Sequence, residues 1–117
     1  MTQDYHPDII LVSCGFDLYM YDRLGGMKVT PEGYALMTFL LLEIAERVCN
    51  GRIAFIMEGG YSLKGIRECG LRVIKELCGV PTVTRKRIDK IMGNSAKKLS
   101  AVKKVIEIQK KYWKILI

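Results

Sequence analysis

The chain has 117 residues and a net charge of +7, and its content of 50% hydrophobic and 26% charged residues suits one small folded domain and excludes an intrinsically disordered chain. The apolar runs at 39–42 and 53–57 fall far short of the ~18 residues that a membrane span needs, and no basic segment followed by an apolar one lies near residue 1. We therefore expect a cytoplasmic protein that has no membrane partner.

The first predicted element is a strand at residues 9–13, where an apolar run rich in β-branched residues ends at Cys14-Gly15. A helix is predicted to follow at residues 31–49. Thr30 is a typical N-cap residue, Pro31 suits the first helical position, and apolar residues then recur at helical spacing as far as Asn50-Gly51.

Residues 53–57 repeat the pattern of the first strand, and a second amphipathic helix is predicted from about Ser62 to the stop signal at residues 79–81. The order strand, helix, strand, helix predicts the α/β class, with parallel strands joined by right-handed crossover helices. Both strands are uninterrupted apolar runs, so we expect them to be covered on two faces.

Residues 82–117 form a basic tail that carries 11 Lys and Arg against 2 Asp and Glu, whereas residues 1–81 carry 8 against 10. The apolar residues of the tail have the spacing of one helix that docks through its apolar side; they are Leu99, Val102, Val105, Ile106, Tyr112, Trp113 and Leu116. We therefore divide the chain into a βαβα portion at 1–81 and an amphipathic helical tail at 82–117. Contact of the tail with nucleic acid or an acidic protein is the alternative.

Two parallel strands do not make a stable sheet, because parallel sheets are normally buried on both faces. We therefore expect one of two situations. Further strands come from a partner chain or from a missing N-terminal segment, or the apolar faces of this chain are partly exposed.

The four cysteines, Cys14, Cys49, Cys69 and Cys78, follow no zinc-finger or thioredoxin spacing. Because they lie in otherwise apolar segments, we expect them to be reduced and buried. The single histidine, His6, cannot by itself provide a catalytic pair or a multi-histidine metal site.

Side chains with chemical potential follow each predicted strand. Asp17 lies on a glycine-supported loop, where a carboxylate is well placed to ligate a metal or, alternatively, to cap a turn. Asp22 precedes a Leu-Gly-Gly segment that must turn sharply, so we interpret it as a turn-stabilising acid. After the second strand, Gly59-Gly60 lets Tyr61 project its hydroxyl into a cleft, where it could hydrogen-bond an oxyanion; a packed tyrosine at a plain strand-to-helix connection is the alternative.

Four motifs in this order resemble the histone deacetylase and acetylpolyamine amidohydrolase superfamily, and its class II-like members most of all. They are Pro7–Asp17, Asp22–Gly25, Thr30–Tyr34 and Glu58–Tyr61. The resemblance covers roughly residues 7–81. It implies a three-layer, arginase-like α/β fold and a zinc-dependent hydrolase that cleaves the amide of acetyl-lysine or of an acetylpolyamine.

The resemblance also implies functions for single residues. Asp17 matches a zinc ligand of the family, and Tyr61 matches the tyrosine that hydrogen-bonds the substrate carbonyl. Leu24 matches a residue at the mouth of the acyl-lysine tunnel, while Gly59 and Gly60 match glycines of its wall.

The chain lacks the Asp-x-His motif and the His-His pair from which the family takes its other zinc ligands and its general base. One aspartate cannot hold a catalytic zinc, which uses three protein ligands and an open position. We therefore expect the C-terminal portion of a deacetylase that is inactive alone and binds zinc only if another segment or chain, such as the N-terminal half of the same domain, supplies the other ligands. The alternative is a non-catalytic module that binds nucleic acid or an acidic protein through its basic tail.

Overall fold

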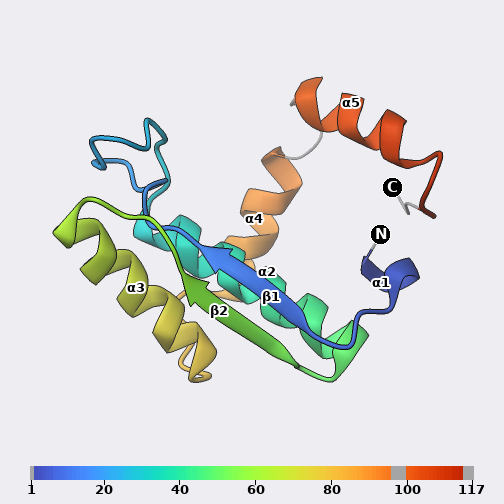
Figure 1. Cartoon of the computed structure of the whole chain (residues 1–117), viewed down its shortest axis with the longest axis horizontal. Helices are drawn as coiled ribbons and strands as arrows, with labels where there is room; N and C mark the ends of the chain where they lie inside the picture. The colour runs from blue at the N-terminus through green and yellow to red at the C-terminus, as the bar shows by residue number, and fades with distance from the viewer. Residues whose placement is uncertain (1, 96–99, 115–117) are drawn as a thin grey trace.

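The computed structural model describes residues 2–95 and 100–114. Its elements are α1 (Thr2–Tyr5), β1 (Ile10–Cys14), α2 (Pro31–Cys49), β2 (Ile53–Met57), α3 (Leu63–Leu77), α4 (Arg85–Ser95) and α5 (Ser100–Gln109) (Figure 1). The predicted order of strand, helix, strand and helix from β1 to α3 is confirmed, and the fold class is α/β. Over the described ranges, no helix is long and apolar enough to cross a membrane.

Both long helices begin at capping residues that the sequence predicted. The hydroxyl oxygen of Thr30 accepts the N–H of Gly33 at 3.1 Å, and the hydroxyl oxygen of Ser62 accepts the N–H of Gly65 at 3.1 Å. Each bond satisfies a backbone donor that the first helical turn leaves without a partner. Helix α2 ends at Asn50, whose φ of 52° lies in the left-handed region that closes many helices.

Strands β1 and β2 pair in parallel, with Ile10 opposite Ile53 and Cys14 opposite Met57. Both arrows in Figure 1 point toward the same end of the sheet, where the chain leaves β1 for its long loop and leaves β2 for α3. The loops that follow the two strands therefore start side by side.

Helices α2 and α3 cover the same face of the sheet. The core joins Tyr34 of α2 and Val73 of α3 to Phe16, and Cys14 of β1 and Phe55 of β2 pack against it. Burial of this shared face explains why the exposed fraction alternates along β1, since successive side chains of a strand point to opposite faces.

The opposite face of the sheet is open. Leu11 of β1 is 66% exposed and Ile56 of β2 is 45% exposed. The prediction that the strands are covered on two faces is therefore wrong for this structure, because both helices lie on one side. The described residues do leave apolar surface of both strands exposed, and coverage of that surface by further strands from another segment or chain stays a prediction.

Helix α4 packs on α2 through one apolar side chain and two ion pairs. Ile88 is 2% exposed and lies in a small core with Ala35 and Val83. Arg85 pairs with Glu43 at 2.8 Å and Arg87 pairs with Glu32 at 2.9 Å. Much of the positive charge of α4 therefore faces carboxylates of this chain.

The last described segment lies against the first helix. The ring of Trp113 contacts that of Tyr5 edge to face at 6.4 Å between centroids, and the N–H of Lys114 donates to Asp4 at 2.8 Å. Of the residues whose spacing predicted one helix, Val102, Val105 and Ile106 lie in α5 as expected, but α5 ends at Gln109, so the prediction is wrong for Tyr112 and Trp113, which lie in the turn beyond it. Leu99 and Leu116, which contributed to that prediction, lie outside the described residues.

All four cysteines are free thiols. Cys49 and Cys69 are buried as predicted, and Cys14 is half-buried. The prediction is wrong for Cys78, which is exposed. It caps the C-terminus of α3, where the chain has already turned away from the core.

Candidate active site

The predicted site residues gather in one place. The N–H of Phe16 donates to the carbonyl of Gly59 at 2.7 Å, and the N–H of Glu58 donates to the carbonyl of Cys14 at 3.1 Å, so the parallel pairing continues past the strands. We call residues 15–25 and 58–62 the loop cluster. The five residues singled out from the sequence all belong to it: Asp17, Leu24, Gly59, Gly60 and Tyr61.

The Asp17 carboxylate lies against two glycines. A Cβ at Gly15 would stand 2.7 Å from its Oδ1, and a Cβ at Gly59 would stand 3.1 Å from its Oδ2. Glycine at both positions leaves the space that the carboxylate occupies. The loop after β2 therefore forms one side of the space that holds the Asp17 carboxylate. Asp17 itself is half-buried.

The turn at Leu24-Gly25 packs on the backbone of Asp17. A Cβ at Gly25 would overlap the carbonyl oxygen of Asp17, so this close approach requires glycine. The Leu24 side chain is 71% exposed to solvent.

Asp22 connects the two loops. Its Oδ1 accepts the N–H groups of Leu24 at 2.9 Å and Gly25 at 3.1 Å, as the turn-stabilising interpretation predicts. Its Oδ2 accepts the N–H of Tyr61 at 2.8 Å, a partner 39 residues away. The N–H groups of Leu24 and Tyr61 hold the pKa of the buried Asp22 carboxyl below its usual value, so it remains a carboxylate.

Sequence analysis missed this second function of Asp22. The local signal, an acid before a Leu-Gly-Gly turn, reveals only the bonds to its own loop. A contact across 39 residues depends on how the strands pair, and no pattern around Asp22 reports that.

The backbone of Tyr61 is restrained by its neighbours, whereas its ring is exposed to solvent. Gly60 precedes it with a φ of 142°, which favours glycine, and a Cβ there would stand 2.9 Å from the Cβ of Phe16. The Tyr61 side chain is 64% exposed. Its hydroxyl is therefore available to a group that approaches the cluster from outside. The catalytic and binding functions that the resemblance implies for the cluster remain predictions.

A cleft of about 370 Å³ begins at the loop cluster and runs between the sheet and α2. Its polar end carries Asp17 and Glu58, and its apolar end carries Leu41 and Phe55. The hydroxyl of Tyr34, also in its lining, donates to the carbonyl of Gly15 at 3.0 Å, and burial raises its pKa to about 12. Tyr34 thus braces the start of the Asp17 loop as a neutral phenol.

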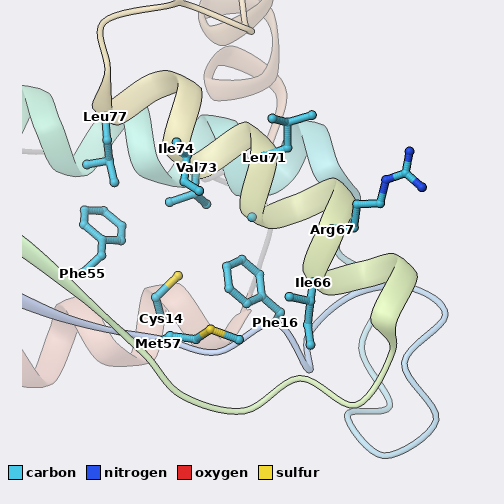
Figure 2. A pocket seen from close by; sticks show the side chains of 11 residues that line it. Cys14, Phe16, Phe55, Met57, Ile66, Arg67, Leu71, Val73, Ile74 and Leu77 are labelled. Atoms are coloured by element: carbon cyan, nitrogen blue, oxygen red, sulfur yellow. The ribbon is translucent and has the colours of Figure 1, made fainter.

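A larger groove of about 590 Å³ lies between β2 and α3 (Figure 2). Phe16, Phe55 and Met57 face it from the sheet side and Leu77 from the helix, while Arg67 points away from them. Among the residues that the structure describes, Arg67 is the one charged residue in its lining, and no carboxylate lines it. We interpret this groove as an uncovered packing surface, because it holds apolar area without polar groups that could do chemistry.

The described residues do not form a catalytic zinc site. Within 2–95 and 100–114, no three His, Cys, Asp or Glu side chains stand close enough to hold a metal ion. Asp17 supplies one carboxylate, and both oxygens of Asp22 are occupied by backbone donors. Since a catalytic zinc takes three protein ligands, this chain alone does not fit the metal.

Two parallel strands with their loops gathered at the carboxyl ends define an α/β unit whose candidate site lies at one edge of the sheet. Residues 1–77 match the family model of the histone deacetylase domain, and the chain belongs to this family.

Individual relatives agree with this membership. The chain is 40% identical over 119 residues to histone deacetylase HDA1 of Candida albicans, an alignment that covers 99% of this chain and 13% of the yeast protein. It is 38% identical over 81 residues to the histone deacetylase-like amidohydrolase of Pseudomonas aeruginosa, which covers 69% of this chain and 21% of the bacterial protein.

A solved structure shows the same fold. The crystal structure of the HDA15 HD domain superposes with a TM-score of 0.72 at 33% identity and covers 96% of this chain and 29% of that chain. The structure is therefore an α/β fragment of the deacetylase fold, and it spans less than a third of the domain that it resembles.

Proposed function

We propose that this chain is the C-terminal portion of a zinc-dependent deacetylase domain, which hydrolyses the amide of acetyl-lysine or of an acetylpolyamine. The observation that carries the proposal is the loop cluster. Two separate strands bring Asp17 and Tyr61 to one edge of the sheet, where the bond between Phe16 and Gly59 joins their loops at 2.7 Å. Relatives of this chain are named as deacetylases and as an amidohydrolase.

In this proposal each residue of the cluster has one task. Asp17 is one zinc ligand, and its carboxylate is held in the space beside Gly15 and Gly59. Tyr61 donates a hydrogen bond to the substrate carbonyl, and the bond strengthens as negative charge develops on that oxygen. The exposed Leu24 offers apolar contact to the methylene chain of the substrate, and Gly59 and Gly60 form part of the tunnel wall.

The isolated chain is inactive in this proposal, because it carries one zinc ligand and lacks the base. The N-terminal half of the same domain supplies the missing groups. Two features support docking of such a partner: the open apolar face with Leu11 and Ile56, and the groove of about 590 Å³ beside β2. Large apolar surfaces of this kind usually mark an interface. A cytoplasmic location and the division at residue 81 belong to the same proposal.

The test measures acetate release from acetyl-lysine peptides and from acetylpolyamines. The chain is assayed alone, with its own upstream coding segment, and with the corresponding half of the Pseudomonas aeruginosa amidohydrolase. We expect activity only in an assembled form. In that form Asp17→Asn should lose bound zinc, whereas Tyr61→Phe should keep zinc and lose turnover by about 100- to 1,000-fold, the effect of removing one oxyanion donor.

Tyr112→Phe is the matched control for Tyr61→Phe. Tyr112 is 75% exposed and lies after α5, outside the loop cluster, so the substitution removes a similarly accessible phenol without touching the proposed site. Activity in the chain alone, or in none of the preparations, would contradict the proposal.

The comparisons do not favour the alternative of a nucleic-acid-binding module. In α4 the guanidinium groups of Arg85 and Arg87 already pair with Glu43 and Glu32. These two guanidinium groups are therefore less available to phosphates, while the pairing involves only two of the 11 Lys and Arg residues of the tail. We therefore do not propose that function.

A further inference from the structure

We propose that Asp22 is a positioning residue of this site: its carboxylate fixes the backbone of Tyr61 against the turn at Leu24-Gly25. This inference rests on the proposed function for the use that the enzyme makes of Tyr61. The positioning itself is a property of the chain and is tested separately.

The two carboxylate oxygens of Asp22 bind different loops. Oδ1 accepts the N–H groups of Leu24 at 2.9 Å and Gly25 at 3.1 Å, and Oδ2 accepts the N–H of Tyr61 at 2.8 Å. Asp22 is 8% exposed, so water competes little for these bonds. One side chain thus sets the distance between the turn that carries Leu24 and the segment that carries Tyr61.

Tyr61 depends on this anchor because other constraints on it are weak. Its ring is 64% exposed, so packing does not hold the side chain in place. Gly60, immediately before it, has the broad conformational freedom of glycine at a φ of 142°. The N–H bond to Asp22 comes directly after this glycine and fixes the Cα from which the phenol projects.

Aspartate is the residue that these three donors require. All three partners are N–H groups, and a carboxylate has acceptors on both oxygens. Asparagine has the same shape, but its amide nitrogen would face either the two donors of the turn or the N–H of Tyr61. If the amide oxygen of the asparagine faces the turn, it keeps the bonds from Leu24 and Gly25 and breaks only one. The N–H of Tyr61 then faces the amide nitrogen and has no acceptor. Asp22→Asn is therefore a selective test of the link between the loops.

The first measurement follows backbone amide resonances of the ¹⁵N-labelled 117-residue chain. In Asp22→Asn we expect the Tyr61 amide proton to move upfield as it loses a charged acceptor, while the amides of β1 and β2 keep their positions and show that the fold persists. Asp22→Glu, which restores both oxygens on a longer side chain, should return the resonance part of the way. Asp8→Asn, an exposed charge change outside the cluster, should leave it unmoved. An unchanged Tyr61 amide in Asp22→Asn overturns the inference.

The second measurement uses the assembled enzyme. We expect Asp22→Asn to lower kcat by about 100-fold, the cost of misplacing a reacting group by roughly 1 Å, with a much smaller change in KM and with zinc content unchanged. A structural defect alone would lower zinc content and the fraction of folded enzyme, and not kcat per zinc. Equal kcat in Asp22→Asn and wild type overturns the inference. An inactive wild-type assembly contradicts the proposed function instead, and the Tyr61 amide resonance then tests by itself whether Asp22 positions Tyr61.

Discussion

The N–H of Phe16 donates to the carbonyl of Gly59 at 2.7 Å, so the two loops of the candidate site are joined by backbone before any side chain contributes. This bond continues the parallel pairing of β1 and β2 by one step beyond Cys14 and Met57. The position of Asp17 relative to the loop after β2 is thus set by the sheet itself. A change that alters Gly59 should therefore act on Asp17.

Gly59→Ala tests this coupling. The new Cβ would stand 3.1 Å from Oδ2 and 3.3 Å from Cγ of Asp17, so the carboxylate must shift by a few tenths of an ångström. Crowding of this kind should lower the free energy of unfolding by no more than about 1 kcal/mol, and we expect the assembled protein to bind zinc more weakly as well. Denaturant unfolding and metal titration provide the two measurements. The control is Gly93→Ala in α4, where a Cβ meets nothing within 4 Å and better helix propensity should raise stability by up to about 1 kcal/mol. Equal effects of the two substitutions would show that the carboxylate does not fill the space beside Gly59.

Particular residues show how far the sequence determines this structure. Thr30-Pro31 and Ser62 predict the starts of α2 and α3 because capping is a local interaction. The apolar runs predict two parallel strands, but not which face each helix covers, since a run without alternation carries no information about sides. The bond from Asp22 to Tyr61 was likewise invisible, because it exists only once the strands are paired. Asp17 and Tyr61 were found through a motif resemblance, and their loops do lie together.

Asp22 should also shape the response of stability to acid. The N–H donors of Leu24 and Tyr61 lower the folded-state pKa of this carboxyl from its ordinary value of 3.8. The stabilisation is therefore complete above pH 3.8 and is lost as the pH falls through the lower folded-state pKa. Asp22→Asn removes this contribution, so its free energy of unfolding should be lower than that of wild type at neutral pH, with the difference shrinking in acid. Urea unfolding at several values between about pH 5 and pH 2 measures it. A difference that stays constant over this interval would contradict the prediction.

The four thiols should react at very different rates. Cys78 is exposed, whereas Cys69 is buried and its burial raises its pKa to about 11, so little thiolate is present there at neutral pH. We expect iodoacetamide to modify Cys78 first and Cys69 only after the chain unfolds. Mass spectrometry of peptides from a time course identifies the order, and Cys78→Ser should abolish the fast phase. Early labelling of Cys69 in the native chain would mean that the core between α2 and α3 opens readily.

The last prediction concerns the open face of the sheet. Leu11 and Ile56 are 66% and 45% exposed, on the side that α2 and α3 leave uncovered. Leu11→Ser removes little buried area from the isolated chain, so its free energy of unfolding should change by less than about 0.5 kcal/mol. If the N-terminal half of the domain covers this face, the same substitution removes a large apolar contact from the interface, worth about 1.5–3 kcal/mol when fully buried. Binding of the two halves, measured by calorimetry, should then weaken by roughly 10- to 100-fold.

Leu63→Ser is the control, because Leu63 is 87% exposed at the start of α3 and lies away from this face. Equal binding by Leu11→Ser and wild type would show that the partner, if it docks, covers a different surface.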